Sequence, residues 1–228
     1  MEINAIILAR GNSKGIPKKN IIDFCGKPLL AWTIEICLKS NYVSDVWVSS
    51  DNEEILKIAQ SFGAKKILRP ANISDDFASS ESAWLNAINH LEKQGITSDI
   101  ILAPQVTSPL REISDIDNAI SIFIKNDFDS LFSACLAEDL FFWQNNGEEV
   151  YSVNYDYKNR KRKQDINEQI IENGSFYLFK PNILIKEKNR LGGKIGYSSM
   201  DIWKMFEIDY EKDIRICSAL MREYLIKE

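Results

Sequence analysis

Short aliphatic runs alternate with longer helical patterns from Ile3 to Cys135, and this alternation limits the fold more than any other feature of the chain. Each run has the length of a buried strand. Strands separated by helices of ten or more residues indicate right-handed crossovers and a mainly parallel sheet with both faces covered. The expected strands span 3–8, 46–50, 66–68, 100–103 and 130–135, and the expected helices span 28–39, 53–62, 80–93 and 113–125.

The crossover pattern stops after Ala137. An aromatic stretch leads through a turn into another apolar run, and a basic polar segment follows, an order that resembles a hairpin with an extended arm. The core pattern resumes at 175–179 and is followed by an expected helix at 182–190. We therefore expect residues 1–228 to form one domain with an arm at about 141–169.

The loop after the first strand combines glycines, small polar residues and positive charges. Gly11 and Gly15 permit tight turns. The cations are Arg10, Lys14, Lys18 and Lys19. Backbone amides beneath several cations form a cradle for an anion, which we interpret as a polyphosphate. The spacing fits neither the P-loop nor the dinucleotide-binding motif. The alternative is a solvated basic loop.

The composition limits which kinds of partner the chain could bind. The chain has 28 basic and 33 acidic residues and a net charge of −5, which argues against a general nucleic-acid binder. Four widely spaced cysteines and one histidine argue against a zinc site. No apolar run approaches the length of a membrane span, and no signal-like segment opens the chain. We expect a cytoplasmic protein with no nucleic-acid or membrane partner.

Several polar segments follow expected strands. Ligands of parallel sheets bind beyond the carboxyl ends of the strands. The fold class therefore predicts one crevice surrounded by 10–20, 49–51, Arg69 and 105–111.

Four carboxylates alternate near the C-terminal end, at Glu207, Asp209, Glu211 and Asp213. In an extended segment alternate side chains share a face, so Glu207 and Asp209 could face one cation. Mg²⁺ prefers one or two carboxylates together with water and phosphate oxygens. The alternative is an acidic helix start, in which carboxylates interact with the helix dipole. We interpret Glu207 and Asp209 as functional and the later pair as structural.

The segment from Leu8 to Asn20 resembles the opening motif of the CMP-N-acylneuraminate synthetases, the cytidylyltransferases that activate sialic acids. The resemblance implies a three-layer, Rossmann-like nucleotidyltransferase fold with a mainly parallel mixed sheet and a protruding dimerisation arm. In the family this motif binds the triphosphate of CTP. The resemblance and the crevice together suggest these nucleotide-binding residues: Leu8, Ala9, Arg10, Asn12, Ser13, Lys14, Lys19, Asn20, Arg69 and Ser80.

Other segments resemble the family's sugar pocket. They are the Gln-x-Thr-Ser-Pro-Leu-Arg segment from Gln105, the basic run that ends in Gln164, and Asn-Gly-Ser-Phe-Tyr from Asn173. The sugar-binding residues that this implies are Gln105, Arg162, Lys163, Gln164, Asn173 and Tyr177. Lys163 stands where the animal-type branch has arginine, and lysine cannot make a bidentate contact with a carboxylate.

The resemblance implies transfer of CMP from CTP to the 2-hydroxyl of a sialic acid or related nonulosonic acid. Arg10, Lys19 and Asp209 would be catalytic, and Asp209 with Glu207 would hold Mg²⁺. The family's first aspartate is replaced by Glu207, so contact through water is an alternative to direct ligation. The implied assembly is a homodimer in which the arm completes the partner's sugar pocket. Two other functions are weighed: a CMP-Kdo-type synthetase for an eight-carbon acid, and a non-catalytic nucleotide-binding regulator.

Overall fold

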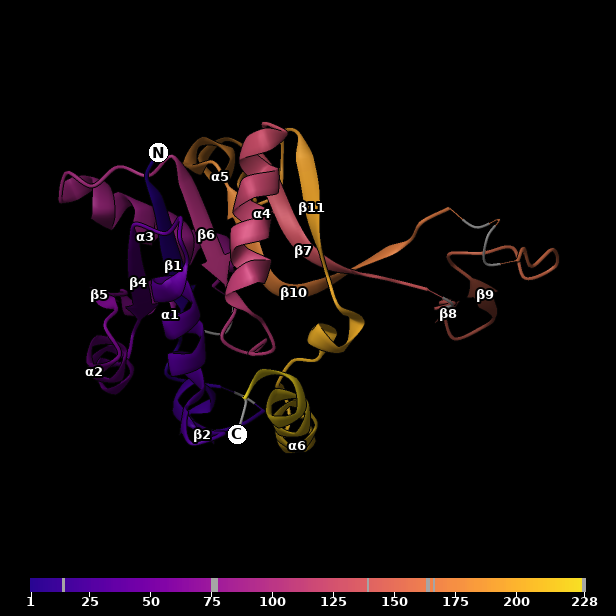
Figure 1. Cartoon of the computed structure of the whole chain (residues 1–228), viewed down its shortest axis with the longest axis horizontal. Coiled ribbons are helices and arrows are strands. Elements are labelled where there is room, and N and C mark those ends of the chain that lie inside the picture. The colour runs from indigo at the N-terminus through magenta and orange to yellow at the C-terminus, as the bar shows by residue number, and fades with distance from the viewer. Residues whose placement is uncertain (14, 75–77, 139, 163–164, 166, 227–228) are drawn as a thin grey trace.

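A mixed sheet of seven strands forms the centre of the described chain, which comprises residues 1–13, 15–74, 78–138, 140–162, 165 and 167–226 of a computed structural model (Figure 1). In spatial order the strands are β11 (Ile195–Met200), β7 (Ser130–Leu136), β10 (Ile170–Phe179), β6 (Ile100–Pro104), β1 (Ile3–Leu8), β4 (Asp45–Ser50) and β5 (Lys65–Leu68). Neighbouring strands are parallel except where β10 pairs with β6 and β7. The predicted mainly parallel sheet is confirmed.

Helices cover both faces of the sheet, as the alternating pattern predicts. They are α1 (Leu29–Lys39), α2 (Glu53–Ser61), α3 (Ser80–Lys93), α4 (Ile113–Lys125), α5 (Pro181–Glu187) and α6 (Glu211–Leu220). Side chains of α1, α2 and α4 share one buried cluster, and those of α3 and α5 share the other. Within β1, Ile7 belongs to the first cluster and Ile6 to the second. This two-residue alternation is what a strand buried on both faces requires.

Polar side chains fix the starts of the helices that follow the strands. The Asn52 side chain accepts hydrogen bonds from the backbone amides of Glu54 and Ile55 at the start of α2. Ser79 accepts one from the amide of Ser82 at the start of α3. Such caps satisfy amides that have no partner within the helix. They also fix where the preceding loops end, close to the carboxyl ends of the strands.

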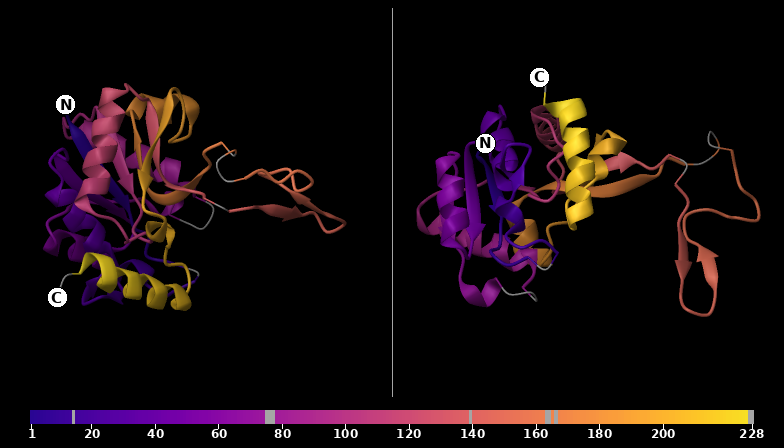
Figure 2. Two further views of the ribbon diagram at one scale, coloured as in Figure 1. Left: turned by 45° about the vertical axis from the view of Figure 1, so that its right-hand side comes forward. Right: turned by 90° about the horizontal axis from the view of Figure 1, so that it is seen from below.

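The segment after β7 leaves the body of the molecule. Two short strands, β8 (Trp143–Asn145) and β9 (Val150–Ser152), form an antiparallel hairpin that projects beyond the ends of β7 and β10 (Figures 1 and 2). The hairpin packs on its own aromatic residues, since the Phe141 and Tyr155 rings lie 4.4 Å apart. Phe142 and Trp143 remain largely exposed. The sequence therefore predicted the protruding arm, whereas its part in dimerisation stays a prediction.

Two features after the arm differ from the sequence reading. The strand expected at 175–179 begins earlier, at Ile170, because β10 also pairs with the part of β7 that leads into the arm. The edge strand β11 is absent from the expected elements. Its residues alternate between exposed and buried, so it lacks the continuous aliphatic run that marked the central strands. No helix in the part of the chain described is long and apolar enough to cross a membrane.

Candidate active site

The loop after β1 folds back onto its own start and onto the end of β4. The amide of Gly11 donates to Asp51 Oδ1 at 2.8 Å, and Asn20 Nδ2 donates to the carbonyl of Arg10 at 2.9 Å. A Cβ atom on Gly11 would lie 2.9 Å from Cβ of Asn52, a distance that side chains do not tolerate. Glycine is therefore required here for the loop to approach the start of α2.

Lys19 joins this loop to the acidic segment near the C-terminal end. Its Nζ atom lies 2.8 Å from Asp209 Oδ1 and donates to the carbonyl of Ile208 at 3.0 Å. A Cβ atom on Gly15 would lie only 2.3 Å from the Asp209 carbonyl oxygen. The amide of Ile208 donates in turn to the carbonyl of Thr107 at 2.7 Å. Three segments that are distant in the sequence thus meet at one point.

Arg69 is a buried cation at the end of β5. Its Nε atom donates to Ser74 Oγ at 3.0 Å, and Nη2 lies 3.9 Å from Asp51 Oδ1. Burial lowers the pKa of Arg69, while the charge of Asp51 acts in the opposite direction. An arginine whose burial is only partly balanced by a carboxylate is suited to an additional anionic or polar ligand.

A cavity of about 410 Å³ opens between these loops at the carboxyl ends of β1, β5 and β6. The predicted residues that line it are Leu8, Arg10, Ser13, Lys19, Asn20, Arg69, Ser80 and Gln105. Thr107, from the predicted 105–111 segment, also lines it, whereas Ser74, Trp84 and Arg190 were not predicted. Four of the lining residues described are cations and none is a carboxylate. This charge distribution fits an anionic ligand.

Some predicted nucleotide-binding residues do not line the cavity. Ala9 is fully buried, and its backbone amide donates to the carbonyl of Ser49 at 3.0 Å. Asn12 is exposed and is not among the described lining residues. Lys14 lies outside the described residues, as do Lys163 and Gln164 on the predicted sugar side.

Glu207 and Gln105 both lie near Gly174. A Cβ atom on Gly174 would be 3.7 Å from Gln105 Nε2 and 3.8 Å from Glu207 Oε2. Burial raises the pKa of Glu207, and the negative charge of Asp209 raises it further. Two neighbouring carboxylates repel each other when both are ionised. A divalent cation bound between them would offset this repulsion, so the pair is suited to bind one.

No group of three or more histidine, cysteine or acidic side chains that could enclose a metal is present among the described residues. The pair at Glu207 and Asp209 therefore fits Mg²⁺ only if phosphate oxygens and water complete its coordination. Asp213 has a different role, because its carboxylate accepts hydrogen bonds from the backbone amides of Asp209 and Tyr210 at the start of α6. This agrees with the structural role expected for Asp213.

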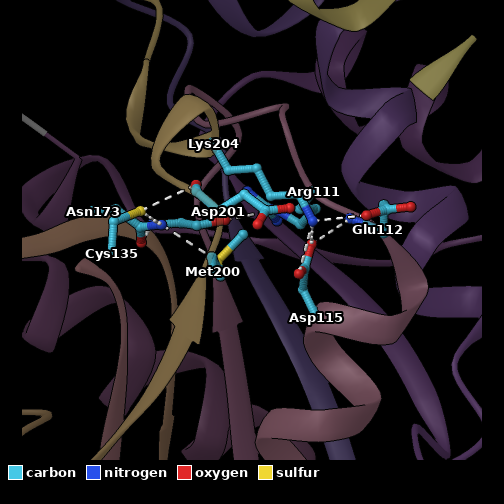
Figure 3. A network of polar contacts seen from close by, with 9 residues as sticks. Arg111, Glu112, Asp115, Cys135, Asn173, Met200, Asp201 and Lys204 are labelled. Atoms are coloured by element: carbon cyan, nitrogen blue, oxygen red, sulfur yellow. Dashed lines mark hydrogen bonds and ion pairs between the residues drawn. The ribbon is translucent and has the colours of Figure 1, made fainter. Parts of the chain in front are cut away.

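A buried polar network that includes Arg111 (Figure 3) holds the loop after β6, which contributes Gln105 and Thr107 to the cavity. The fully buried Arg111 donates through Nη2 to the carbonyls of Gln105 and Ser108, and through Nε to Ser175 Oγ at 3.1 Å. It thereby fixes the loop after β6 to β10. Burial lowers the pKa of Arg111 to about 10.

Two predicted sugar-binding residues of β10 also make contacts within the protein. Asn173 is buried, and its Nδ2 atom contacts Met200 Sδ at 3.3 Å and Cys135 Sγ at 3.5 Å, as Figure 3 shows. The Tyr177 hydroxyl donates to Glu172; burial, followed by this bond, raises the pKa of Tyr177 to about 12. Neither residue is among those that line the cavity.

Arg162 lies on the exposed arm, which projects away from the body that contains the cavity (Figure 2). Arg162 is not among the described lining residues. The predicted residues of the β1 loop thus meet at one cavity, whereas Arg162 of the arm does not line it.

Comparisons with known proteins agree with this geometry. The family model described as cytidylyltransferase matches residues 4–226. The chain is 37% identical over 215 residues to N-acylneuraminate cytidylyltransferase A of Danio rerio, a match that covers 92% of this chain and 49% of that protein. It is 41% identical over 177 residues to a pseudaminic acid cytidylyltransferase of Campylobacter jejuni subsp. jejuni, with 75% of each chain covered. The chain thus spans about half the length of the first of these relatives and three quarters of the second.

Solved structures share the fold. A CMP-2-keto-3-deoxy-manno-octonic acid synthetase complexed with CTP superposes with a TM-score of 0.73 at 17% identity, covering 99% of this chain and 100% of that one. A 4-diphosphocytidyl-2C-methyl-D-erythritol synthase superposes with a TM-score of 0.70 at 12% identity, covering 96% of this chain and 98% of that one. These likenesses concern the Rossmann-like nucleotidyltransferase fold alone. The family match, which covers nearly the whole sequence, shows that this chain belongs to the cytidylyltransferases.

Proposed function

We propose that this chain transfers CMP from CTP to the anomeric 2-hydroxyl of a nine-carbon α-keto acid sugar and releases pyrophosphate. The observation that carries the proposal is the cavity lined by cations, whose β1 loop is joined to Asp209 through Lys19 at 2.8 Å. The relatives named for N-acylneuraminate and pseudaminic acid support the choice of sugar.

In this reaction the sugar hydroxyl attacks the α-phosphorus in line while pyrophosphate leaves. Catalysis of such a step consists mainly of positioning and of stabilising the charge on phosphate oxygens. Arg10, Ser13 and Lys19 would hold the triphosphate from the β1 loop. Arg69 and Ser80 lie on the same cavity and would face the nucleoside.

Asp209, assisted by Glu207, would hold Mg²⁺, which when bound supplies positive charge to the phosphate oxygens. In the structure Lys19 donates to Asp209, so the same carboxylate is within reach of the loop that would carry the triphosphate. Gln105, like Glu207, lies near Gly174 and would contact the sugar. The contacts of Asn173 and Tyr177 within the protein favour a role in shaping the sugar pocket.

We further propose that the active form is a homodimer in the cytoplasm. The exposed Phe142 and Trp143 on the arm need a partner surface, and the basic segment that includes Arg162 follows on the same arm. Arg162 is not among the described residues that line the cavity. A second copy could bring Arg162, Lys163 and Gln164 to it.

The proposal is tested by incubating the purified protein with CTP, Mg²⁺ and a panel of sugar acids, and by measuring pyrophosphate release. The panel contains several nonulosonic acids and one eight-carbon acid, because the superposed octonic acid synthetase makes the latter a second candidate. We expect release with at least one nonulosonic acid and little with the eight-carbon acid. Activity with the eight-carbon acid alone would favour the second candidate. Tight CTP binding without release would favour a nucleotide-binding regulator.

A further inference from the structure

Arg190 is a cationic residue of the cavity to which no role has yet been given. It lies in the loop between α5 and β11, whereas Arg10 and Lys19 belong to the loop after β1 and Arg69 follows β5. Its side chain is about one quarter exposed, with a relative accessibility of 24%. It is therefore accessible from the cavity but held by the protein around it.

Three side chains fix the orientation of this guanidinium. Nη1 lies 2.8 Å from Glu81 Oε1, and the central carbon lies 4.3 Å from the Tyr177 ring centre and 5.2 Å from the Trp84 ring centre. An arginine held by a carboxylate and stacked on aromatic rings has lost most of its conformational freedom before a ligand arrives. This is the preorganisation that favours specific binding.

The loop that carries Arg190 is itself anchored to the sheet. Ser130 Oγ donates to the carbonyl of Gly192 at 2.8 Å and accepts the Gly192 amide at 3.0 Å. Gly193 has a φ of +62°, and a Cβ atom there would lie 2.5 Å from Asp129 Oδ2. The Gly-Gly pair thus allows the loop to lie against Asp129, directly after Arg190 and Leu191.

The strand order separates Arg190 from Arg69 and from the loop after β1, whereas Glu81, its ion-pair partner, directly follows Ser80. Tyr177, on which Arg190 stacks, belongs to β10, which lies two strands from β1 and four strands from β5. At about 4.8 Å between strands, these separations are roughly 10 Å and 19 Å. Arg190 therefore lies on the side of the cavity away from Arg69, the side that the proposed function leaves for the acceptor sugar.

The chemistry of the group indicates what it would recognise. A guanidinium has five N–H donors in a planar fork; the ion pair with Glu81 engages Nη1, and a side-chain hydrogen bond to Tyr177 engages one further donor. Because Glu81 already balances the charge, a neutral acceptor is suitable as well as an anionic one. The planar fork matches a planar oxygen acceptor such as a carboxylate or an amide carbonyl.

We propose that Arg190 is a specificity-determining residue that donates hydrogen bonds to a planar oxygen acceptor, either the carboxylate or the N-acyl carbonyl, of the sugar acid. This inference rests on the proposed function, since it assigns one part of the cavity to that sugar. It also explains why Glu81, Trp84 and Tyr177 converge on one side chain.

The test compares Arg190→Met and Arg190→Lys with Lys186→Met, which removes an exposed cation of α5 that does not line the cavity. Pyrophosphate release gives KM for CTP and for each sugar acid, and calorimetry gives the Kd of the sugar acids for protein saturated with CDP. We expect Arg190→Met to raise the KM and the Kd of the sugar acid roughly tenfold, because a charge-assisted hydrogen bond is lost. The KM for CTP should stay within about twofold of the wild-type value. Arg190→Lys retains the charge but not the planar fork of donors, so the KM and Kd of the sugar acid should still be several-fold above the wild-type values. Lys186→Met should match the wild type.

Sugar acids with and without an N-acyl group distinguish the two acceptors. A defect confined to the acylated sugars assigns Arg190 to the carbonyl, and a defect with every sugar assigns it to the carboxylate. Unchanged sugar constants in Arg190→Met, or an equal rise in KM for CTP, would overturn the proposal. If the wild type releases no pyrophosphate with any acid, the proposed function fails, and the calorimetric comparison still tests Arg190. Absence of any sugar binding by the wild type would overturn both.

Discussion

Lys18 and Lys19 are adjacent in the sequence but face different carboxylates. Lys18 pairs with Glu54 at the surface, where its side chain is 62% exposed, whereas the side chain of Lys19 is 13% exposed and pairs with Asp209. A surface ion pair contributes little to stability. A sheltered cation on the cavity is instead available to stabilise negative charge on a phosphate.

Lys19→Ala should therefore reduce kcat/KM for CTP by about a hundredfold or more, comparable to removal of one preorganised donor from an active site. Lys18→Ala is the matched control and should remain within about threefold of the wild type, because its surface ion pair lies outside the cavity. Steady-state kinetics of pyrophosphate release measures both. Equal losses in the two variants would show that Lys19 has no special position.

Asp209→Asn should lower turnover by roughly a thousandfold, equivalent to about 4 kcal/mol of barrier, because the proposed metal loses its anionic ligand. Glu207→Gln should have a smaller effect if Glu207 acts through water. Raised Mg²⁺ concentrations should partly restore the Asp209 variant. Near-normal turnover at ordinary Mg²⁺ would remove Asp209 from the metal site.

Asp213→Ala separates this metal role from helix capping. Asp213 accepts two backbone amides at the start of α6, so its substitution should lower the free energy of unfolding by about 1 kcal/mol. Turnover of the folded variant should change little. Thermal unfolding and kinetics on the same sample check both expectations, and a turnover loss as large as that of Asp209→Asn would contradict them.

Individual site residues were predictable where a motif surrounds them. Arg10, Ser13 and Lys19 belong to one continuous segment, and the structure brings them to one cavity. Arg190 could not be found in this way, because it acquires its position from Glu81 and Tyr177, which are distant in the sequence. The sequence signal near Arg190 is the Gly-Gly pair that follows it. This pair indicates a close approach of two backbone segments, but it does not indicate which residues the Arg190 side chain contacts.

At the scale of elements, the sequence predicted the parallel units well. Strands such as β1 and β4 are buried on both faces, and this burial produces the aliphatic runs that the sequence displays. β10 and β11 were harder to predict, because the direction of a strand and its pairing depend on the neighbouring strands and not on the local sequence pattern. The antiparallel direction of β10 follows from the arm, which returns the chain beside β7.

The 3-10 helix η4 (Ile202–Met205) is tied to the start of α4 by a buried ion pair. Lys204 is almost fully buried and lies 2.8 Å from Asp115 and 2.7 Å from Glu112 (Figure 3). Burial alone would lower the pKa of Lys204, but its hydrogen bonds to these carboxylates outweigh that effect and raise it. The segment leading to Glu207 thus starts from a fixed point.

Lys204→Met should lower the free energy of unfolding by about 3 kcal/mol, because it leaves the Asp115 carboxylate buried without its partner. The double variant Lys204→Met/Asp115→Asn should lose less than the sum of the two single variants, since both members of the pair are then neutral. Denaturant unfolding of the four proteins measures the coupling. Strict additivity would show that the ion pair does not couple η4 to α4.

At the scale of the whole molecule, the arm is the part that one chain does not explain. Its hairpin projects away from the sheet (Figures 1 and 2). It packs on its own aromatic rings, and large apolar side chains remain exposed on it. Exposed apolar surface of this kind marks an interaction site. A second copy of the chain is the partner that the proposed function requires.

If the arm completes the partner's site, mixing two inactive variants should restore activity. One carries Arg162→Ala and Lys163→Ala on the arm, and the other carries Lys19→Ala in the cavity. A mixed dimer contains one site with neither defect, so as much as about a quarter of wild-type activity should return after equal mixing and subunit exchange. No recovery, despite exchange verified by native mass spectrometry, would mean that each site is built within one chain.

The fate of the α-phosphate of CTP tests the central claim most directly. The protein is incubated with Mg²⁺, a nonulosonic acid and CTP that carries a radioactive label on either the α- or the γ-phosphate, and the products are separated by chromatography. We predict that the α label is recovered in a CMP-sugar and the γ label in pyrophosphate, with nothing transferred when the sugar acid is omitted. Recovery of the α label only in CTP, CDP or free CMP with every nonulosonic acid would contradict the account.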